Sequence, residues 1–307
     1  MQSSSRSYPF ATLDVFTDSR FAGNPLAVVL DADGLDDAAM QAIAREFNLS
    51  ETTFVSKPER PGHSARVRIF TPAMELPFAG HPTVGTAIYL AERQRTDDAG
   101  LNALIVLEEA IGTVRVGVRF REGAAPFAEF DAPKLPVDQG EPASREHLAD
   151  ALGLMPSEIG FANHKPSKFS AGVPFMFVPV ASLDAVRRAQ PDLRSWTAAF
   201  GQSGKIAPYV YTRNGEHMTS SFHARMFDPP AGIPEDPATG SAAAAFAAVV
   251  AKFDRPPAGW HKRIIEQGFE MGRPSLITLS LEMSGAALET VRIGGNAVIV
   301  SEGTLRV

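Results

Sequence analysis

The chain has 307 residues, enough for two domains with their own cores, and its 44% hydrophobic and 21% charged residues are ordinary for a globular protein. Its formal net charge of −6, without a basic cluster, argues against nucleic acid as a partner. The chain has no cysteine, which excludes disulfides, thiolate metal sites and every thiol-based mechanism.

Strand and helix patterns alternate through the first part of the chain. Residues 10–16 are apolar at alternate positions, and residues 26–30 form a continuous apolar run, so we expect two strands. From Asp36 the apolar residues recur with the period of an amphipathic helix, which we expect to end at residues 48–50. Further strands are predicted at residues 52–56, 65–70, 104–108 and 113–120, with a helix that begins near His81 lying among them.

The second part of the chain repeats this pattern. A stretch rich in proline and alanine, residues 124–142, is the predicted linker. After it, GVPFMFVPV at 172–180 matches GNPLAVVL at 23–30. We therefore predict an α/β (α+β) fold of two pseudo-symmetric halves, each a strongly curved mixed sheet around a central helix. The predicted N-terminal half is residues 1–128, which the last strand, 298–307, would complete, and the C-terminal half is residues 129–297.

One motif occurs twice, as GHPTVGT at 80–86 and as EDPATGS at 235–241. Superposing the copies places His81 on Asp236 and Gly85 on Gly240, and each copy runs into an alanine-rich segment. Proline followed by a small-residue turn and an apolar run is typical of a helix N-terminus, whose N–H groups and dipole attract a carboxylate or phosphate. Two such starts would hold one small anion in a cleft between the halves, beside His81 and Asp236.

A simpler interpretation is that the motif only caps helices. Aspartate is a favoured N-cap and proline a favoured first helical residue, so a single copy would be read in this way. The repeated glycine and hydroxyl residue weaken this interpretation, because capping does not demand them, but a duplication could also preserve them without function. Glu51, between a helix end and an apolar strand, is a candidate acid/base group, because apolar surroundings raise a carboxyl pKa. The alternative for Glu51 is a solvated loop glutamate, or one paired with an arginine.

Several other functions lack their sequence signals. The chain has no phosphate-binding P-loop, no GxGxxG after a strand, no GxSxG and no HxxxH or HxH spacing, so we expect no metal site. The first residues lack the apolar core of a secretion signal. The longest apolar run, residues 242–251, is far shorter than the roughly 20 residues that span a bilayer. We therefore expect a cytoplasmic protein with no membrane partner.

Several longer segments together resemble a known family. They are FTDSRFAGNPLAVVL, IAREFNLSETTFV, RIFTPAMELPFAGHPTVGTA, RMFDPPAGIPEDPATGSA and EQGFEMGRPS, in the order of the phenazine-biosynthesis isomerase family, the PhzF-like proteins. The resemblance runs from about Phe10 to the C-terminus and implies the diaminopimelate-epimerase-like fold. Diaminopimelate epimerases and proline racemases use two cysteines, which this chain lacks. In PhzF-like proteins one glutamate is the acid/base, and the match places it at Glu51.

The resemblance also implies the rest of the site and the reaction. His81 and Asp236 would act with Glu51 in catalysis, and the substrate-binding residues would be Gly80, Gly240, Ser241 and Asn24. The implied enzyme is a cofactor-independent homodimeric isomerase of a small amino or hydroxy carboxylic acid, such as trans-2,3-dihydro-3-hydroxyanthranilate, a step toward phenazines. Two alternatives stay open: another cofactor-free epimerase or lyase, and a protein that binds a small acid without catalysis.

Overall fold

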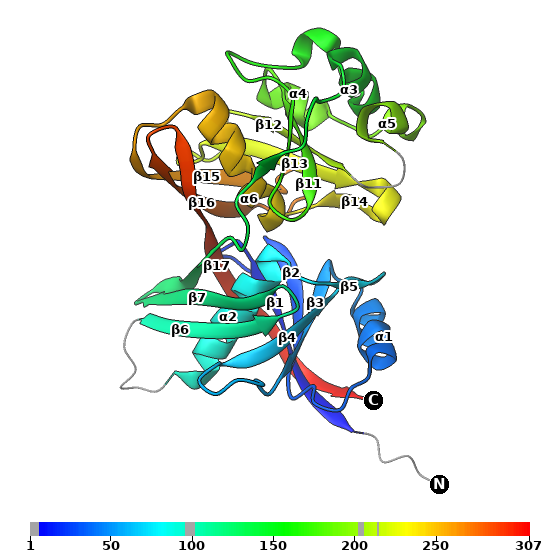
Figure 1. Cartoon of the computed structure of the whole chain (residues 1–307). Coiled ribbons are helices and arrows are strands. Elements are labelled where there is room, and N and C mark those ends of the chain that lie inside the picture. The colour runs from blue at the N-terminus through cyan, green and yellow to red at the C-terminus, as the bar shows by residue number, and fades with distance from the viewer. Residues whose placement is uncertain (1–5, 96–101, 202–205, 214) are drawn as a thin grey trace. The chain divides into compact units, whose positions relative to one another are not determined.

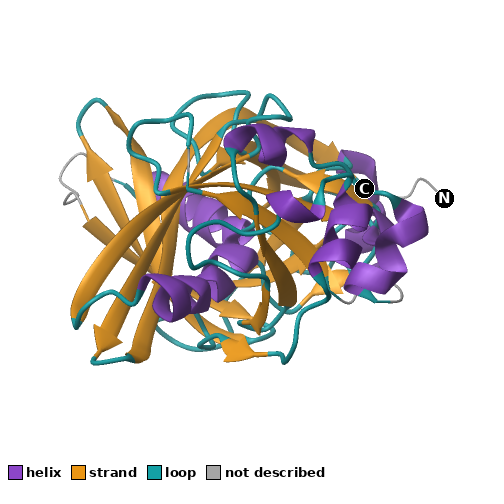
Figure 2. Cartoon of the chain, turned by 90° about the horizontal axis from the view of Figure 1, so that it is seen from above, coloured by secondary structure: helices purple, strands orange, loops and turns teal. Residues whose placement is uncertain are grey.

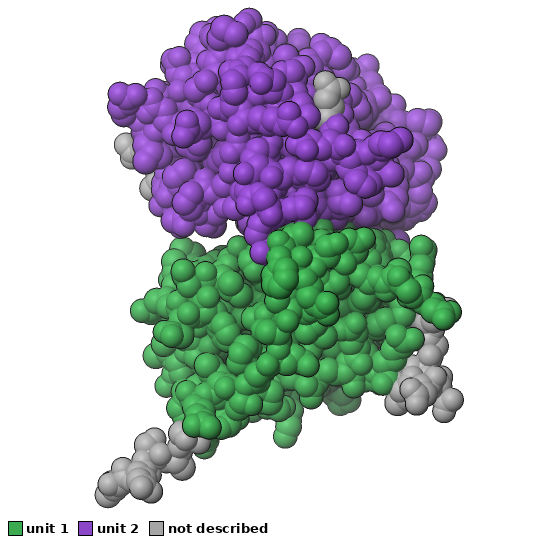
Figure 3. All heavy atoms as spheres, turned by 180° about the vertical axis from the view of Figure 1, so that it is seen from behind, with its two compact units in different colours: residues 1–131, 294–307 green, residues 132–293 purple. Residues whose placement is uncertain are grey.

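The chain forms two compact units. The computed structural model describes residues 6–95, 102–201, 206–213 and 215–307 (Figure 1). Unit 1 comprises Met1–Asp131 and Gly294–Val307, and unit 2 comprises Ala132–Ile293 (Figure 3). Among the described residues, no helix is long and apolar enough to cross a membrane.

The strands of unit 1 close into a barrel. They are β1 (Ser7–Val15), β2 (Asn24–Val29), β3 (Glu51–Ser56), β4 (Ala65–Phe70), β5 (Glu75–Leu76), β6 (Asn102–Glu109), β7 (Gly112–Arg121), β8 (Ala124–Asp131) and the part of β17 (Ala287–Arg306) from Gly294 on, drawn as orange arrows in Figure 2. The pairing runs β17–β1–β2–β3–β4–β6–β7–β8 and returns to β17, with β2–β3 and β4–β6 parallel. The short β5 pairs with β4 alone.

The helix α2 (Gly80–Gln94) is the central element of this barrel. It contacts β1, β2, β3, β6, β7 and β8, and every residue from Gly80 to Ala91 is buried. Such an all-round buried helix needs apolar residues on every side, as the alanine-rich sequence provides. Gly85 lets the helix approach the wall, because a Cβ there would lie 2.6 Å from Leu26 Cδ2 and 2.7 Å from Val15 Cγ2. The motif glycine is therefore a packing residue.

The helix α1 (Asp37–Phe47) packs on the outside of the barrel. Its buried residues Met40, Ile43 and Ala44 join a core cluster with Val29 and Phe54. Asp36 accepts a hydrogen bond from the Ala39 N–H at 2.8 Å, and Asn48 ends the helix in the left-handed conformation. The predicted start after Asp36 and end at residue 48 are confirmed.

Unit 2 is a second mixed sheet with its own central helix. Its strands are β9 (Val137–Asp138), β10 (Ser167–Ser170), β11 (Pro174–Pro179), β12 (Ala207–Thr212), β13 (Phe222–Asp228), β14 (Ile233–Asp236), β15 (Gly259–Gln267) and β16 (Ser275–Ser284). The pairing order is β9–β10–β11–β12–β13–β15–β16, with β14 also on β13. The helix α6 (Gly240–Val249) packs on one face, and a π-helical turn, Val250–Asp254, follows it.

Both faces of the unit 2 sheet are covered by helices. In β11, Phe177 packs against Phe246 of α6, whereas Met176 and Val178 point to the opposite core cluster. That cluster contains α3 (Arg145–Leu152), α4 (Leu183–Arg188) and α5 (Leu193–Phe200). Short 3₁₀ turns occur at Pro156–Glu158 and Pro229–Ala231. The fold class predicted from the repeat is confirmed, with three outer helices in addition.

The predicted linker is wrong over its first part. Residues 124–131 are the barrel strand β8, with Ala128 and Phe130 buried, and Val137–Asp138 is the short strand β9. The alternation of buried and exposed residues in this segment was hidden by its alanine and proline content. The backbones of β8 and β17 approach so closely that a Cβ on Gly294 would lie 2.7 Å from the Ala128 carbonyl oxygen.

Candidate active site

The structure brings Glu51 and His81 together in unit 1. Glu51 is the first residue of β3, just after the end of α1, and His81 is the second residue of α2. The His81 Nε2 and Glu51 Oε2 atoms are 3.2 Å apart, and the side chains are only 5% and 16% exposed. The interpretation of Glu51 as a solvated loop residue is wrong, because its side chain lies mostly inside the barrel end against a buried imidazole.

The hydrogen bonds of His81 show which ring nitrogen carries its proton. The ring bonds to the backbone of Pro25, which has only a carbonyl to offer and so accepts the N–H. Within the described residues Nε2 makes no aligned hydrogen bond, so Nδ1 is the donor. Burial lowers the pKa of His81 to about 3, although the bond to Pro25 opposes this shift. His81 is therefore a neutral imidazole whose Nε2 lone pair faces the Glu51 carboxyl group.

The short distance between His81 Nε2 and Glu51 Oε2 would allow the pair to share one proton. A neutral Nε2 and an ionised carboxylate would both present lone pairs across 3.2 Å, which is unfavourable. One proton between them, carried on the carboxyl group, turns the contact into an attractive one. The arrangement can therefore accept a proton at Glu51 and hold it, as an acid/base group must.

Neither His81 nor Asp236, which the repeated motif superposes, caps a helix. The N-cap of α2 is Ala79, which offers no side-chain hydrogen bond, and His81 lies inside the helix. Asp236 ends β14, four residues before α6 begins at Gly240. The capping interpretation is wrong, and so is the expectation that Asp236 sits at the helix tip, because Pro237 lies in the preceding turn instead of the first helical turn.

Asp236 is fixed by two buried residues that sequence reasoning missed. Thr239 Oγ1 donates to Asp236 Oδ2 at 2.5 Å. The Gln267 side-chain amide, which is fully buried, donates to the Asp236 carbonyl at 2.7 Å and to Thr239 Oγ1 at 2.9 Å. Thr239 is the N-cap of α6, but its side-chain oxygen accepts no hydrogen bond from the helix N–H groups, so the helix start has no side-chain cap.

The EQG segment carried the signal for this arrangement. A Cβ on Gly268, which has φ +78°, would lie 2.6 Å from the Pro237 carbonyl oxygen. Only glycine therefore allows the β15 end to press against the turn after Asp236. This close approach brings Gln267 to Asp236, and the segment could have been read as part of the site.

The remaining predicted residues lie near these groups. Asn24 begins β2, is fully buried and directly precedes the Pro25 carbonyl that holds His81. Gly80 is the first residue of α2 and is buried, whereas Ser241 is the second residue of α6 and is half-buried. The structure thus groups Asn24, Glu51, Gly80 and His81 in unit 1, and Asp236, Gly240 and Ser241 in unit 2.

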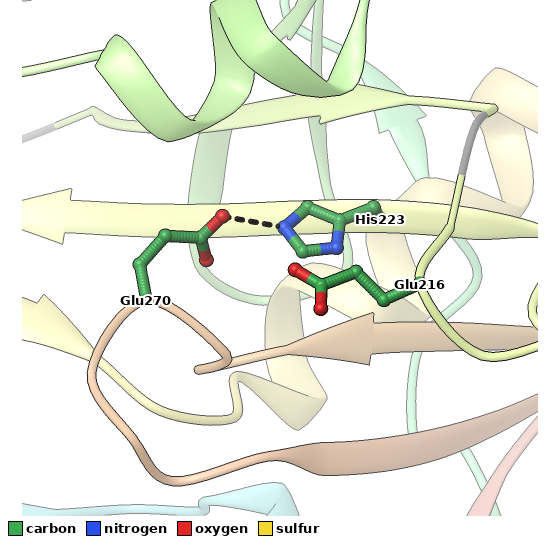
Figure 4. A group of neighbouring side chains, drawn as sticks. All are labelled: Glu216, His223 and Glu270. Atoms are coloured by element: carbon green, nitrogen blue, oxygen red, sulfur yellow. Dashed lines mark hydrogen bonds and ion pairs between the residues drawn. The ribbon is translucent and has the colours of Figure 1, made fainter.

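Another charged cluster lies in unit 2. The ligand atoms of Glu216, His223 and Glu270 lie within 4.8 Å of one another, a spacing that a metal ion could use. Figure 4 shows the Glu270 carboxylate bonded to the ring of His223, with the Glu216 carboxylate beside it. The other ring nitrogen bonds to Glu266 at 2.7 Å. Burial opposes the charge, but these two carboxylates raise the pKa of His223 to about 9, so the ring is an imidazolium with no lone pair for a metal.

Comparisons with known proteins agree on one family. A family model described as phenazine biosynthesis-like protein, PhzC-PhzF, matches residues 13–303. An uncharacterized isomerase of Mesorhizobium japonicum is 54% identical, with 95% of this chain and 96% of the relative covered. The trans-2,3-dihydro-3-hydroxyanthranilate isomerase of Pseudomonas fluorescens is 38% identical, with 96% and 98% covered. A crystal structure of a PhzF-family protein from Bacillus anthracis has a TM-score of 0.87 and 28% identity, covering 98% and 99%.

These relatives define the class of the chain: it is an isomerase. More narrowly, it belongs to the phenazine biosynthesis-like family, PhzC-PhzF. The family and the fold that the sequence resemblance implied are both confirmed.

Proposed function

We propose that the chain moves a proton between two carbons of a small amino or hydroxy carboxylic acid, with Glu51 as the single acid/base group. The contact between Glu51 and a neutral His81 is the observation that supports this most strongly. The substrate would resemble trans-2,3-dihydro-3-hydroxyanthranilate, on which the Pseudomonas fluorescens relative acts.

The proton follows a closed path. The Glu51 carboxylate removes a proton from carbon, and the electrons of the broken C–H bond enter the conjugated system of the substrate. The same carboxyl group returns the proton to another carbon of that system, so no oxidant and no second base is consumed. While Glu51 carries the proton, the His81 Nε2 lone pair accepts a hydrogen bond from it. Low exposure of both side chains slows the loss of this proton to water.

The second part of the proposal concerns substrate binding. The uncapped starts of α2 and α6 offer backbone N–H groups to an anion, at Gly80 in unit 1 and at Gly240 and Ser241 in unit 2. Asp236 binds an ammonium or hydroxyl group of the substrate, held in place by Thr239 and Gln267. In unit 1, Asn24, which directly precedes Pro25, would contribute to substrate binding. We further propose that the enzyme is a cytoplasmic homodimer that needs no metal and no organic cofactor.

Proton NMR in D₂O tests the proposal directly. Dihydrohydroxyanthranilate is added to the wild type and to Glu51→Gln, and conversion and deuterium content are followed. We expect conversion by the wild type and none by Glu51→Gln, with ligand-induced thermal stabilisation in both proteins. Thermal stabilisation without turnover in the wild type would favour a binding protein. Inversion of a centre without double-bond movement would favour an epimerase, and either result would overturn the proposal.

A further inference from the structure

Glu109 is a buried carboxyl group that the proposed chemistry does not use. It ends β6, is 7% exposed, and its Oε1 lies 2.7 Å from the hydroxyl of Thr83 in the first turns of α2. Its other oxygen, Oε2, is buried without a hydrogen-bond partner among the described residues. Among the residues that the structure describes, Glu109 takes part in no ion pair. A carboxylate in such a place would be costly, and burial raises the pKa of Glu109 to about 8, although a hydrogen bond that Thr83 can donate to the charged form opposes this.

The Thr83 hydroxyl indicates which way the hydrogen bonds run. Its oxygen also lies 2.8 Å from the Ala79 carbonyl oxygen. A hydroxyl has one proton, and a carbonyl can only accept. With an ionised Glu109, Thr83 would have to share its single proton between the two acceptors. Each contact is a full hydrogen bond when Glu109 carries a proton and donates it to Thr83, while Thr83 donates to Ala79. The order is therefore Glu109 to Thr83 to the Ala79 carbonyl.

The end of this chain of hydrogen bonds lies at the candidate site. The Ala79 carbonyl belongs to the same peptide unit as the Gly80 N–H, the first N–H group of α2. A hydrogen bond accepted by the carbonyl polarises the peptide and strengthens its N–H as a donor, because consecutive hydrogen bonds reinforce one another. Ala79 is the N-cap and its side chain makes no hydrogen bond to the helix N–H groups.

We propose that Glu109, in its acid form, is a positioning residue that acts through Thr83 to orient and polarise the Gly80 amide for an anionic group of the substrate. This inference rests on the proposed function, because it takes the α2 start as the site of a carboxylate. Glu109 touches no reacting atom in this role. It acts on substrate affinity, whereas Glu51 acts on the proton transfer.

Steady-state kinetics of matched variants test the role. Glu109→Leu and Thr83→Val break the chain of hydrogen bonds, and we expect each to raise KM about tenfold with kcat within about twofold of the wild type. Glu109→Gln keeps a neutral donor to Thr83 and should restore KM to within about threefold. Thr86→Val is the control, because Thr86 lies in the same helix and bonds to Thr53 at 3.0 Å instead. A fall in kcat at constant KM, or equal effects of the leucine and glutamine variants, would overturn the proposal.

The amide itself gives a readout that needs no turnover. In ¹H–¹⁵N spectra of the unliganded protein, the Gly80 amide proton should move upfield in Thr83→Val and Glu109→Leu, and stay in place in Glu109→Gln and Thr86→Val. An unmoved Gly80 resonance in both breaking variants would overturn the inference even if the enzyme is active. A shifted resonance without turnover of dihydrohydroxyanthranilate would support it while overturning the proposed substrate. Thr83→Val and Glu109→Gln keep the test open if Glu109→Leu does not fold.

Discussion

The starts of α2 and α6 are built on the same frame and carry different chemistry. In unit 1, Arg68 bonds through two nitrogens to Glu75 of β5, at 2.7 and 2.6 Å, and stacks over Phe70. In unit 2, Arg225 bonds in the same way to Glu235 of β14, at 2.8 Å twice, and stacks over Phe227. Each arginine thus ties down the short strand before a central helix.

The residues that follow these strands have diverged. In unit 1 a neutral histidine faces a carboxyl group, an arrangement that can gain and lose a proton. In unit 2 an aspartate is held by a threonine hydroxyl and a glutamine amide, which fix an acceptor in one position. The duplicated frame therefore supplies two helix starts without side-chain caps. Under the proposed function, the local side chains divide proton transfer, in unit 1, from substrate holding, in unit 2.

Removing the imidazole of unit 1 should have the largest effect on the reaction. His81→Leu deletes the Nε2 acceptor that stabilises the proton on Glu51, and we expect kcat to fall by about 10²–10³. Tyr89→Phe, in the same helix, is the control and should leave kcat unchanged. Stopped assays measure kcat, and circular dichroism verifies that both variants fold. An unchanged kcat in His81→Leu would mean that the histidine at the start of α2 is not needed for the proton transfer. The two helix starts would then not differ in the way proposed.

Removing the side chain that holds Asp236 in unit 2 should have a smaller effect, mainly on substrate binding. Gln267→Leu removes the amide that holds Asp236 and Thr239, and we expect kcat/KM to fall about 10- to 100-fold, mostly through KM. The exposed Gln139→Leu in the same unit is the matched control. A loss confined to kcat would mean that Asp236 takes part in the proton transfer as well.

Arg68 and Arg225, which each bond to the short strand before a central helix, should differ in their contribution to stability. Arg225 is 8% exposed and also donates to the carbonyls of Val186, Arg187 and Ala189. Lysine cannot reproduce this fork, so Arg225→Lys should lower the free energy of unfolding by about 3 kcal/mol. The Arg68 side chain is 22% exposed and its partners more so, and Arg68→Lys should cost about 1 kcal/mol. Urea unfolding measures both, and equal losses would contradict the difference in burial.

Two buried histidines should respond to pH in opposite directions. The folded pKa of His81, about 3, lies below the unfolded value of about 6.5, so its contribution to stability is present above pH 6.5 and is lost as pH falls toward 3. The folded pKa of His223, about 9, lies above the unfolded value, so its contribution is present below pH 6.5 and is lost as pH rises through 9. Imidazole ¹⁵N spectra from pH 4 to 10 should find His81 neutral above pH 4 and His223 charged up to about pH 9. Protonation of the His81 ring near pH 6 would contradict its lowered pKa.

The sequence was most informative where a pattern is local. The amphipathic period of α1 and the long repeat predicted elements correctly, because spacing along one helix or strand is enough to define them. The contacts that organise the site join distant segments: Gln267 reaches Asp236 only because Gly268 packs on Pro237. The strand β8 was missed for a similar reason, since its place in the barrel depends on pairing with β7 and β17.

In the proposed mechanism, one carboxyl group, shielded beside His81, removes and returns the same proton. The most direct test uses substrate deuterated at the reacting carbon, converted by the wild type in H₂O, with the deuterium content of the product measured at the earliest turnovers. We expect part of the deuterium to appear at the new position in the product. Product that forms entirely without the substrate's deuterium, from the first turnover on, would contradict it.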